Sequence, residues 1–115
     1  MVSIVPADKD FLKRLKIVPD ELVYCLTASD GKQSLGYVVF ELYGRQVVII
    51  SLEAADEAIT DGLIRAALNL SREKGATSAV CGIKTIYPVL KKVGFNRNGS
   101  NLSADINKVL SGKCG

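Results

Sequence analysis

The hydrophobic pattern changes its period in the middle of this chain, and this change restricts the fold more than any other feature. From residue 22 to residue 50, apolar residues alternate with polar ones or form short β-branched runs, which is typical of strands joined by turns. From residue 59 to residue 70 they recur every three or four residues, as in an amphipathic helix. The sequence therefore predicts an antiparallel meander followed by a long helix.

The first half of the chain is expected to be mostly strands. Its predicted elements are a strand at residues 3–5, a short helix capped by Asp8 or Asp10, and strands at 22–28, 35–43 and 47–50. Turns are expected at 29–32 and 43–46. Val47 to Ile50 are all β-branched, which favours a central strand that is covered on both faces.

The second half is expected to add a parallel strand. Gly75 follows Arg72 and Lys74, a sequence that suits the end of the long helix. The later elements expected are a strand at 79–83 parallel to 47–50, a helix at 85–92 with Pro88 in its first turn, a turn at 96–100 and a final strand at 102–109. The fold class is therefore α/β (α+β), with a mixed sheet.

Length and composition fit a single domain over residues 1–115. Hydrophobic residues make up 48% of the chain, which is enough for one buried core. No apolar run approaches the roughly 20 residues that a membrane span needs, and Met1–Phe11 does not resemble a signal peptide. We expect a cytoplasmic protein that has no membrane partner.

The chain contains no histidine, and this absence excludes several kinds of chemistry. Catalytic triads, histidine acid–base catalysis and histidine metal sites all require that side chain. The three cysteines have no CxxC spacing, so no metal site or disulfide framework is expected. Cys25 and Cys81 lie in apolar runs and are predicted to be buried, whereas Cys114 is expected to lie in a mobile tail.

The order of these elements, together with three short segments, resembles the GNAT superfamily of acyl-CoA-dependent acetyltransferases. Leu63–Leu68 and Ser71–Ala76 are similar to the main helix of that family and its exit turn, and Leu90–Phe95 is similar to its late helix. The resemblance covers about residues 35–110. It implies acetyl-CoA as cofactor, an amine substrate, and a V-shaped cleft where strands 47–50 and 79–83 splay apart. Another α+β sandwich would keep that strand pair hydrogen-bonded throughout.

The phosphate-binding loop departs from the family pattern. The family has Gln/Arg-x-x-Gly-x-Gly/Ala, whereas Ala55–Thr60 has neither the basic residue nor the glycines. Asp56 and Glu57 would repel phosphates, and they are equally suited to capping the helix. If acetyl-CoA binds, the resemblance implies contacts with residues of the strand end and the helix start. These are Leu52, Glu53, Ala58, Ile59, Thr60, Asp61 and Gly62.

The resemblance also implies two catalytic positions. Glu53 corresponds to the group that deprotonates the amine, although it could equally belong to a solvated acidic edge. The usual acidic tyrosine is replaced by Leu90, and Tyr87 either substitutes for it or serves as a packing or surface residue. Residues 8–19 have room for only one of the two helices that line the family's acceptor site.

Charge is distributed unevenly along the chain. Residues 36–62 sum to −4 and residues 63–115 to +7. Basic residues near the end could meet a coenzyme 3′-phosphate or an acidic partner, or form a solvated face. They are Lys91, Lys92, Arg97, Lys108 and Lys113. Without clustered aromatics they do not indicate a nucleic-acid partner.

Two functions remain after these arguments. The first is a divergent acyl-CoA-dependent N-acetyltransferase of unknown acceptor. The alternative is a non-catalytic GNAT-like domain that acts in protein–protein interaction or homodimerisation.

Overall fold

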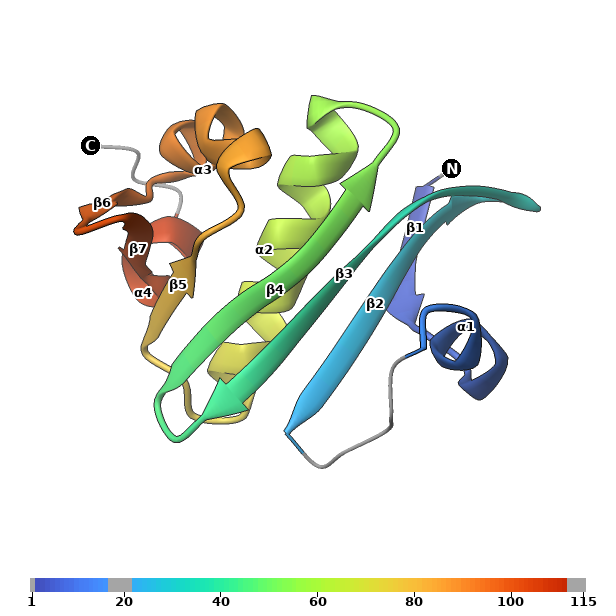
Figure 1. Cartoon of the computed structure of the whole chain (residues 1–115), viewed down its shortest axis with the longest axis horizontal. Coiled ribbons are helices and arrows are strands. Elements are labelled where there is room, and N and C mark those ends of the chain that lie inside the picture. The colour runs from blue at the N-terminus through green and yellow to red at the C-terminus, as the bar shows by residue number, and fades with distance from the viewer. Residues whose placement is uncertain (1, 17–21, 112–115) are drawn as a thin grey trace.

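A computed structural model describes residues 2–16 and 22–111, which form a seven-stranded sheet with helices on both faces (Figure 1). The strands are β1 (Val2–Pro6), β2 (Val23–Asp30), β3 (Gln33–Tyr43), β4 (Gln46–Ala54), β5 (Ser78–Cys81), β6 (Asn96–Asn98) and β7 (Asn101–Asp105). The helices are α1 (Lys9–Arg14), α2 (Glu57–Glu73), α3 (Tyr87–Val93) and α4 (Ile106–Leu110), with a 3-10 turn at Lys84–Ile86.

The sheet is mixed, as the sequence predicted. Its order is β1-β2-β3-β4-β5-β7-β6, and every neighbouring pair is antiparallel except β4 and β5. The parallel pair is joined through α2. The β2 strand runs further than expected, through Asp30, so that the turn before β3 consists of Gly31 and Lys32.

The long helix α2 covers one face of the sheet, and its buried stripe explains why it forms there. Leu63, Ile64, Ala67 and Leu68 are completely buried in the core between α2 and the sheet. At the end of the helix, the Ala76 N–H donates to the Ser71 carbonyl at 2.9 Å. In Figure 1, α2 lies behind the sheet and α1 lies in front of it.

The end of the described chain corrects the sequence prediction. The predicted final strand at 102–109 is wrong, because β7 ends at Asp105 and α4 follows. The Asp105 carboxylate accepts hydrogen bonds from the N–H groups of Asn107 (3.0 Å) and Lys108 (3.4 Å), which is a helix cap. The region expected to be a turn at 96–100 contains β6, which pairs with β7 as a hairpin.

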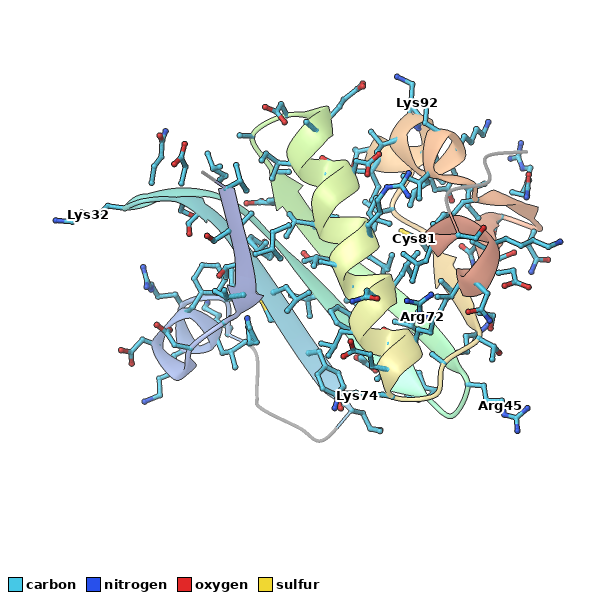
Figure 2. All side chains as sticks on the ribbon, turned by 180° about the vertical axis from the view of Figure 1, so that it is seen from behind. Lys32, Arg45, Arg72, Lys74, Cys81 and Lys92 are labelled. Atoms are coloured by element: carbon cyan, nitrogen blue, oxygen red, sulfur yellow. The ribbon has the colours of Figure 1, made fainter. Side chains whose placement is uncertain are left out.

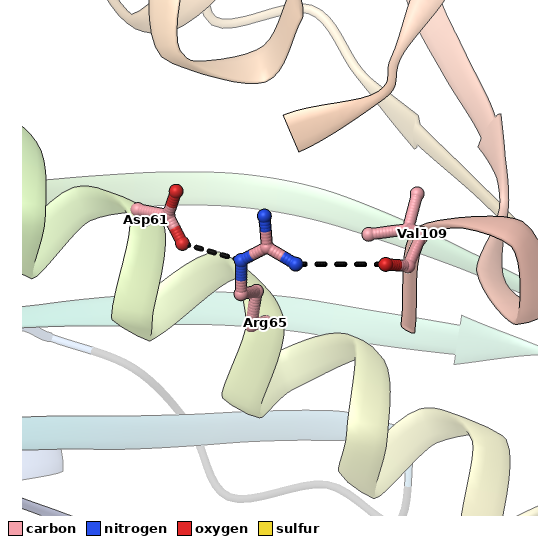
Figure 3. Close-up of polar contacts among 3 residues, drawn as sticks. All are labelled: Asp61, Arg65 and Val109. Carbon is pink, nitrogen blue, oxygen red and sulfur yellow. Dashed lines mark hydrogen bonds and ion pairs between the residues drawn. The ribbon is translucent and has the colours of Figure 1, made fainter. Parts of the chain in front are cut away.

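An arginine attaches α4 to α2 (Figure 3). The Arg65 Nε donates to Asp61 Oδ1 at 2.5 Å, and its guanidinium also donates to the Val109 carbonyl at 3.5 Å. The same side chain therefore satisfies a carboxylate near the start of α2 and a carbonyl near the end of α4.

The expectation that 47–50 is covered on both faces is also wrong. Val47 (0% exposed) and Ile49 (2%) face the core, but Ile50 is 45% exposed. The reason is that α1 is short and lies toward β2, so it covers only part of the front face (Figure 1).

The described ranges contain no candidate membrane span and no candidate metal-binding group. None of the helices there is long and apolar enough to cross a membrane. No group of three or more Cys, Asp or Glu side chains among those residues could hold a metal ion. Cys25 and Cys81 are buried, which confirms that prediction, and Cys114 lies outside the described residues.

Candidate functional site

The two parallel strands separate half-way along β4. Their pairing runs from Gln46 opposite Ser78 to Ile49 opposite Cys81, and there β5 ends. The β4 strand continues to Ala54, paired on its other side with β3. Figure 1 shows β4 and the segment that leads to α3 diverging from this point. The predicted parallel pairing is confirmed, and it stops half-way along β4 because β5 ends; the V-shaped cleft stays a prediction.

A β-bulge lies at the point of separation. Phe40 pairs with Ile49 and Val39 pairs with Ser51, so Ile50 is the extra residue on β4. Beyond the bulge, Leu52 packs against the core, and the exposed Glu53 lies on the front face of the sheet.

Gly36 on β3 permits the close contact that holds the free part of β4. Its φ is +155°, a conformation that other residues rarely adopt. A Cβ at this position would overlap the Glu53 carbonyl oxygen and would lie 2.8 Å from the Ala54 Cα. The sequence placed Gly36 on a strand but gave no sign of this close approach.

The start of α2 is occupied by the protein's own side chains. The Asp56 carboxylate accepts from the Ile59 N–H at 2.8 Å, which confirms the predicted cap. The Lys92 ammonium on α3 pairs with the Glu57 carboxylate at 3.3 Å. Both side chains are largely exposed, Lys92 at 70% and Glu57 at 68%. This ion pair therefore bridges α2 and α3 at the surface, and Figure 2 shows Lys92 extending from α3.

An open depression of about 360 Å³ lies between α2 and α3. It is lined by Glu57, Ala58, Asp61, Val89 and Lys92. Two carboxylates therefore face one ammonium, although the Arg65 guanidinium also contacts Asp61. The depression has room for an anion but is not strongly electropositive.

The structure divides the predicted cofactor residues into three groups. Leu52 and Glu53 lie on the part of β4 that β5 leaves unpaired, and Ala58 and Asp61 line the depression. Ile59, Thr60 and Gly62 are turned inward. Thr60 is buried and donates to the Asp56 carbonyl, and a Cβ on Gly62 would contact Ile4 at 3.4 Å.

Tyr87 and Glu53 lie in different surroundings. The Tyr87 hydroxyl donates to the Ser100 carbonyl at 2.8 Å, in the turn of the β6–β7 hairpin. Glu53 lines a depression of about 420 Å³ beside α1, and within the described part of the chain this depression does not include Tyr87. The predicted acid and base are therefore not brought together in this structure.

The depression beside α1 contains residues that the sequence analysis did not select. Phe11, Leu15 and Tyr37 line it together with Glu53, and the rings of Phe11 and Tyr37 meet edge to face at 5.7 Å. The alternation of β3 placed Tyr37 opposite the core face, which was the available signal. The position of α1 over that face was not predictable.

Both described thiols are protonated at neutral pH and are not suited to nucleophilic attack. Burial raises the pKa of Cys25 to about 11. Burial also raises the pKa of Cys81, against the opposing effect of a hydrogen bond from the Ile83 N–H. Figure 2 shows Cys81 inside the molecule beside α2.

Solved structures of N-acetyltransferases share this architecture. The ribosomal-protein-S18-alanine N-acetyltransferase from Escherichia coli matches with a TM-score of 0.76 and 8% identity, over 92% of this chain and 94% of that chain. The aminoglycoside 6′-N-acetyltransferase from Enterococcus faecium matches with a TM-score of 0.71 and 12% identity, over 90% and 97%. The chain has the GNAT fold.

A third structure carries a ligand. A GNAT family acetyltransferase from Brucella melitensis in complex with acetyl-CoA matches the chain with a TM-score of 0.68 and 18% identity, over 91% of this chain and 88% of that chain. No protein-family model matches the chain, and no curated protein matches its sequence. At these identities the similarity shows the GNAT fold and leaves the activity to be argued from the site.

Proposed function

We propose that this protein is an acyl-CoA-dependent N-acetyltransferase. The observation that carries the proposal is the free edge of β4 at residues 50–54, which opens beside the start of α2 in a GNAT fold. An unpaired strand edge offers backbone donors and acceptors to an extended amide-containing chain. Acetyl-CoA contains such a chain, and the Brucella neighbour was solved with that molecule.

The residues present fit one end of acetyl-CoA better than the other. The β4 edge suits the amide chain, and the depression between α2 and α3 has the space for phosphates. The phosphate end has Lys92 as its cation, but Glu57 already pairs with this ammonium. Binding at that end requires Lys92 to exchange a carboxylate for a phosphate, so we expect modest affinity.

Catalysis is assigned to β4. The bound cofactor would supply an acetyl group as a thioester. Backbone N–H groups near Leu52 and Glu53 would polarise the carbonyl, and the Glu53 carboxylate would accept the proton of the attacking amine. Tyr87 would protonate the leaving thiolate only after its hydroxyl leaves the Ser100 carbonyl. Glu53 is therefore the residue on which the proposal depends most.

Calorimetric titration with acetyl-CoA and an Ala58→Glu variant test the proposal. Ala58 is exposed in the first turn of α2, where an acidic residue suits the helix, so the variant should fold normally. The added carboxylate should lower acetyl-CoA affinity about 5-fold through repulsion of the phosphates. Asn69→Glu, on an exposed part of the same helix, is the charge-matched control and should leave the affinity unchanged. The absence of both heat and thermal shift at millimolar acetyl-CoA would contradict the proposal.

The alternative is a non-catalytic GNAT-like domain that binds a protein partner or a second copy. Two observations favour it: the start of α2 is capped by Asp56, and the Tyr87 hydroxyl is bonded to backbone. The edge strand β1 exposes Val2 (45%) and Val5 (49%) and would offer a contact surface. Light scattering that finds a monomer at all concentrations, together with acetyl-CoA binding, would exclude this alternative.

A further inference from the structure

The front face of the sheet carries a continuous groove beside α1, which we call the α1 groove. Its central part is the depression of about 420 Å³ that contains Glu53. Its inner end is a smaller pocket of about 140 Å³, lined by Leu15, Tyr37, Val39, Ile50 and Ser51. Leu15 and Tyr37 line both parts, so the two are adjacent.

The β-bulge on β4 connects this groove with the free strand edge. Tyr37 is the register partner of Glu53, and Val39 is the partner of Ser51, so these four side chains share the front face. Successive residues of a strand rise by roughly 3.4 Å, so Glu53 and Ser51 lie about 7 Å apart along β4. A molecule of one ring and a two-carbon arm can reach from the inner pocket to Glu53.

The groove has a simple charge pattern. Among the described residues, Glu53 is the charged side chain that lines its two parts, and the others are apolar, aromatic or hydroxyl-bearing. Arg14 and Lys32 line a neighbouring depression that shares Phe11 and Ser34 with the groove, and the Arg14 guanidinium carbon lies 5.8 Å from the centre of the Phe11 ring. Figure 2 shows Lys32 pointing away from the molecule at the tip of a hairpin. One carboxylate beside an apolar pocket is complementary to a cation on an apolar body.

The volume of the inner pocket indicates the size of the group that it can cover. A cavity of about 150 Å³ with apolar walls accommodates benzene. The pocket of Leu15, Val39 and Ile50 is half open to solvent, and at about 140 Å³ it can cover one ring or a short alkyl chain on one side.

We propose that the acceptor of this site is a small primary amine on an uncharged apolar body of about one ring, with no carboxylate beside the amine. Its role as acceptor depends on the acetyltransferase function proposed above. The ammonium would lie at Glu53 and the body in the inner pocket. An α-amino acid is disfavoured, because its carboxylate would lie near the Glu53 carboxylate, and the described residues that line the groove itself include no cation.

Three amines test this assignment. Phenethylamine has both the amine and the ring, phenylalanine adds the carboxylate, and methylamine lacks the ring. Binding is measured by NMR titration without acetyl-CoA, and acetylation is measured by thiol release with acetyl-CoA. Phenethylamine should bind at least about 10-fold more tightly than either comparison compound, as expected for a buried ring and an unopposed carboxylate.

Variants locate the binding in the groove. Ile50→Arg places a cation in the inner pocket and should weaken phenethylamine binding about 10-fold, and Glu53→Gln should weaken it about 5-fold. Val2→Arg is the matched control, because Val2 and Ile50 are both 45% exposed and Val2 lies on the outer strand β1. The control should bind phenethylamine like the wild type.

The outcomes separate this inference from the acetyltransferase proposal. If phenylalanine or methylamine performs as well as phenethylamine, or if Ile50→Arg has no effect, the amine assignment is wrong, whatever the result with acetyl-CoA. If phenethylamine binding depends on Ile50 and Glu53 but acetyl-CoA does not bind, the groove is an amine site and the acetyltransferase proposal fails. Acetylation of phenethylamine that both variants reduce supports both proposals.

Discussion

The two halves of β4 have the same strand geometry but opposite environments. Residues 46–49 pair with β3 on one side and β5 on the other, and Val47 and Ile49 are buried against α2. Residues 50–54 pair with β3 alone, and Ile50 and Glu53 are exposed. The first half contributes to stability through burial, whereas the second half leaves one backbone edge unpaired by β5 and two side chains exposed.

This difference shows how a strand within a sheet can offer a candidate site without a long loop. A strand that is paired on both sides has no free backbone donors or acceptors. A site that binds a ligand through the strand backbone therefore has to begin where one neighbouring strand ends. In this chain β5 leaves at Cys81, and the remaining neighbour, β3, holds the free half in position.

A substitution at Gly36 tests how the free half is held. Gly36→Ala should destabilise the protein by about 4 kcal/mol, from the positive φ and from the overlap with the backbone at Glu53 and Ala54. Gly44→Ala is the control, since Gly44 has a φ of +61° with no atom within 4 Å of an added Cβ. It should cost only about 1 to 2 kcal/mol. Urea unfolding of both variants measures the difference, and equal losses would show that the close approach is unimportant.

Neighbouring isoleucines compare the two halves directly. Ile49→Ala should cost about 3 kcal/mol, because it leaves a cavity in the core. Ile50→Ala should cost less than about 1 kcal/mol, because the side chain is already half exposed. Thermal and chemical unfolding supply both values. Similar losses at the two positions would mean that the front face is covered in solution.

The helix cap beyond β4 should contribute less to stability than Gly36 or Ile49. Asp56→Ala should cost about 1 kcal/mol, because the Ile59 N–H loses its acceptor. The same change removes a carboxylate near the proposed phosphate site, so acetyl-CoA should bind more tightly in calorimetry. Asp8→Ala removes the matching cap of α1, where the Phe11 N–H donates to Asp8 at 2.7 Å. It should lower stability without the gain in affinity, and a gain in both variants would refute the electrostatic explanation.

Sequence periodicity predicted most of the fold, because the meander and the long helix each keep one period over many residues. It failed at the last helix, where Leu102 and Ala104 continue the strand pattern and Ile106 still fits it. The spacing of Ile106, Val109 and Leu110 after Asp105 is typical of a capped helix. This spacing was the available signal that the strand ends at Asp105.

The candidate site was less predictable than the fold. The carboxylate at Glu53 and the Asp56 cap follow from local sequence and from the family resemblance. The α1 groove depends on contacts between Leu15, Tyr37 and Ile50, which are distant in sequence and meet only when α1 lies on the sheet. The hydrogen bond from Tyr87 to Ser100 likewise depends on the β6–β7 hairpin. The sequence predicted only an irregular turn at residues 96–100.

The bulge at Ile50 determines which face of the sheet carries the Glu53 carboxylate. A regular strand counts its residues in twos, so odd positions of β4 would all face α2, as Val47 and Ile49 do. One inserted residue reverses the parity from Ser51 onward and turns Glu53 outward. If Ile50 paired regularly with β3 instead of forming the bulge, the Glu53 carboxylate would face α2 and Leu52 would be exposed. One extra residue on β4 therefore decides which of the side chains that follow it face the core and which face solvent.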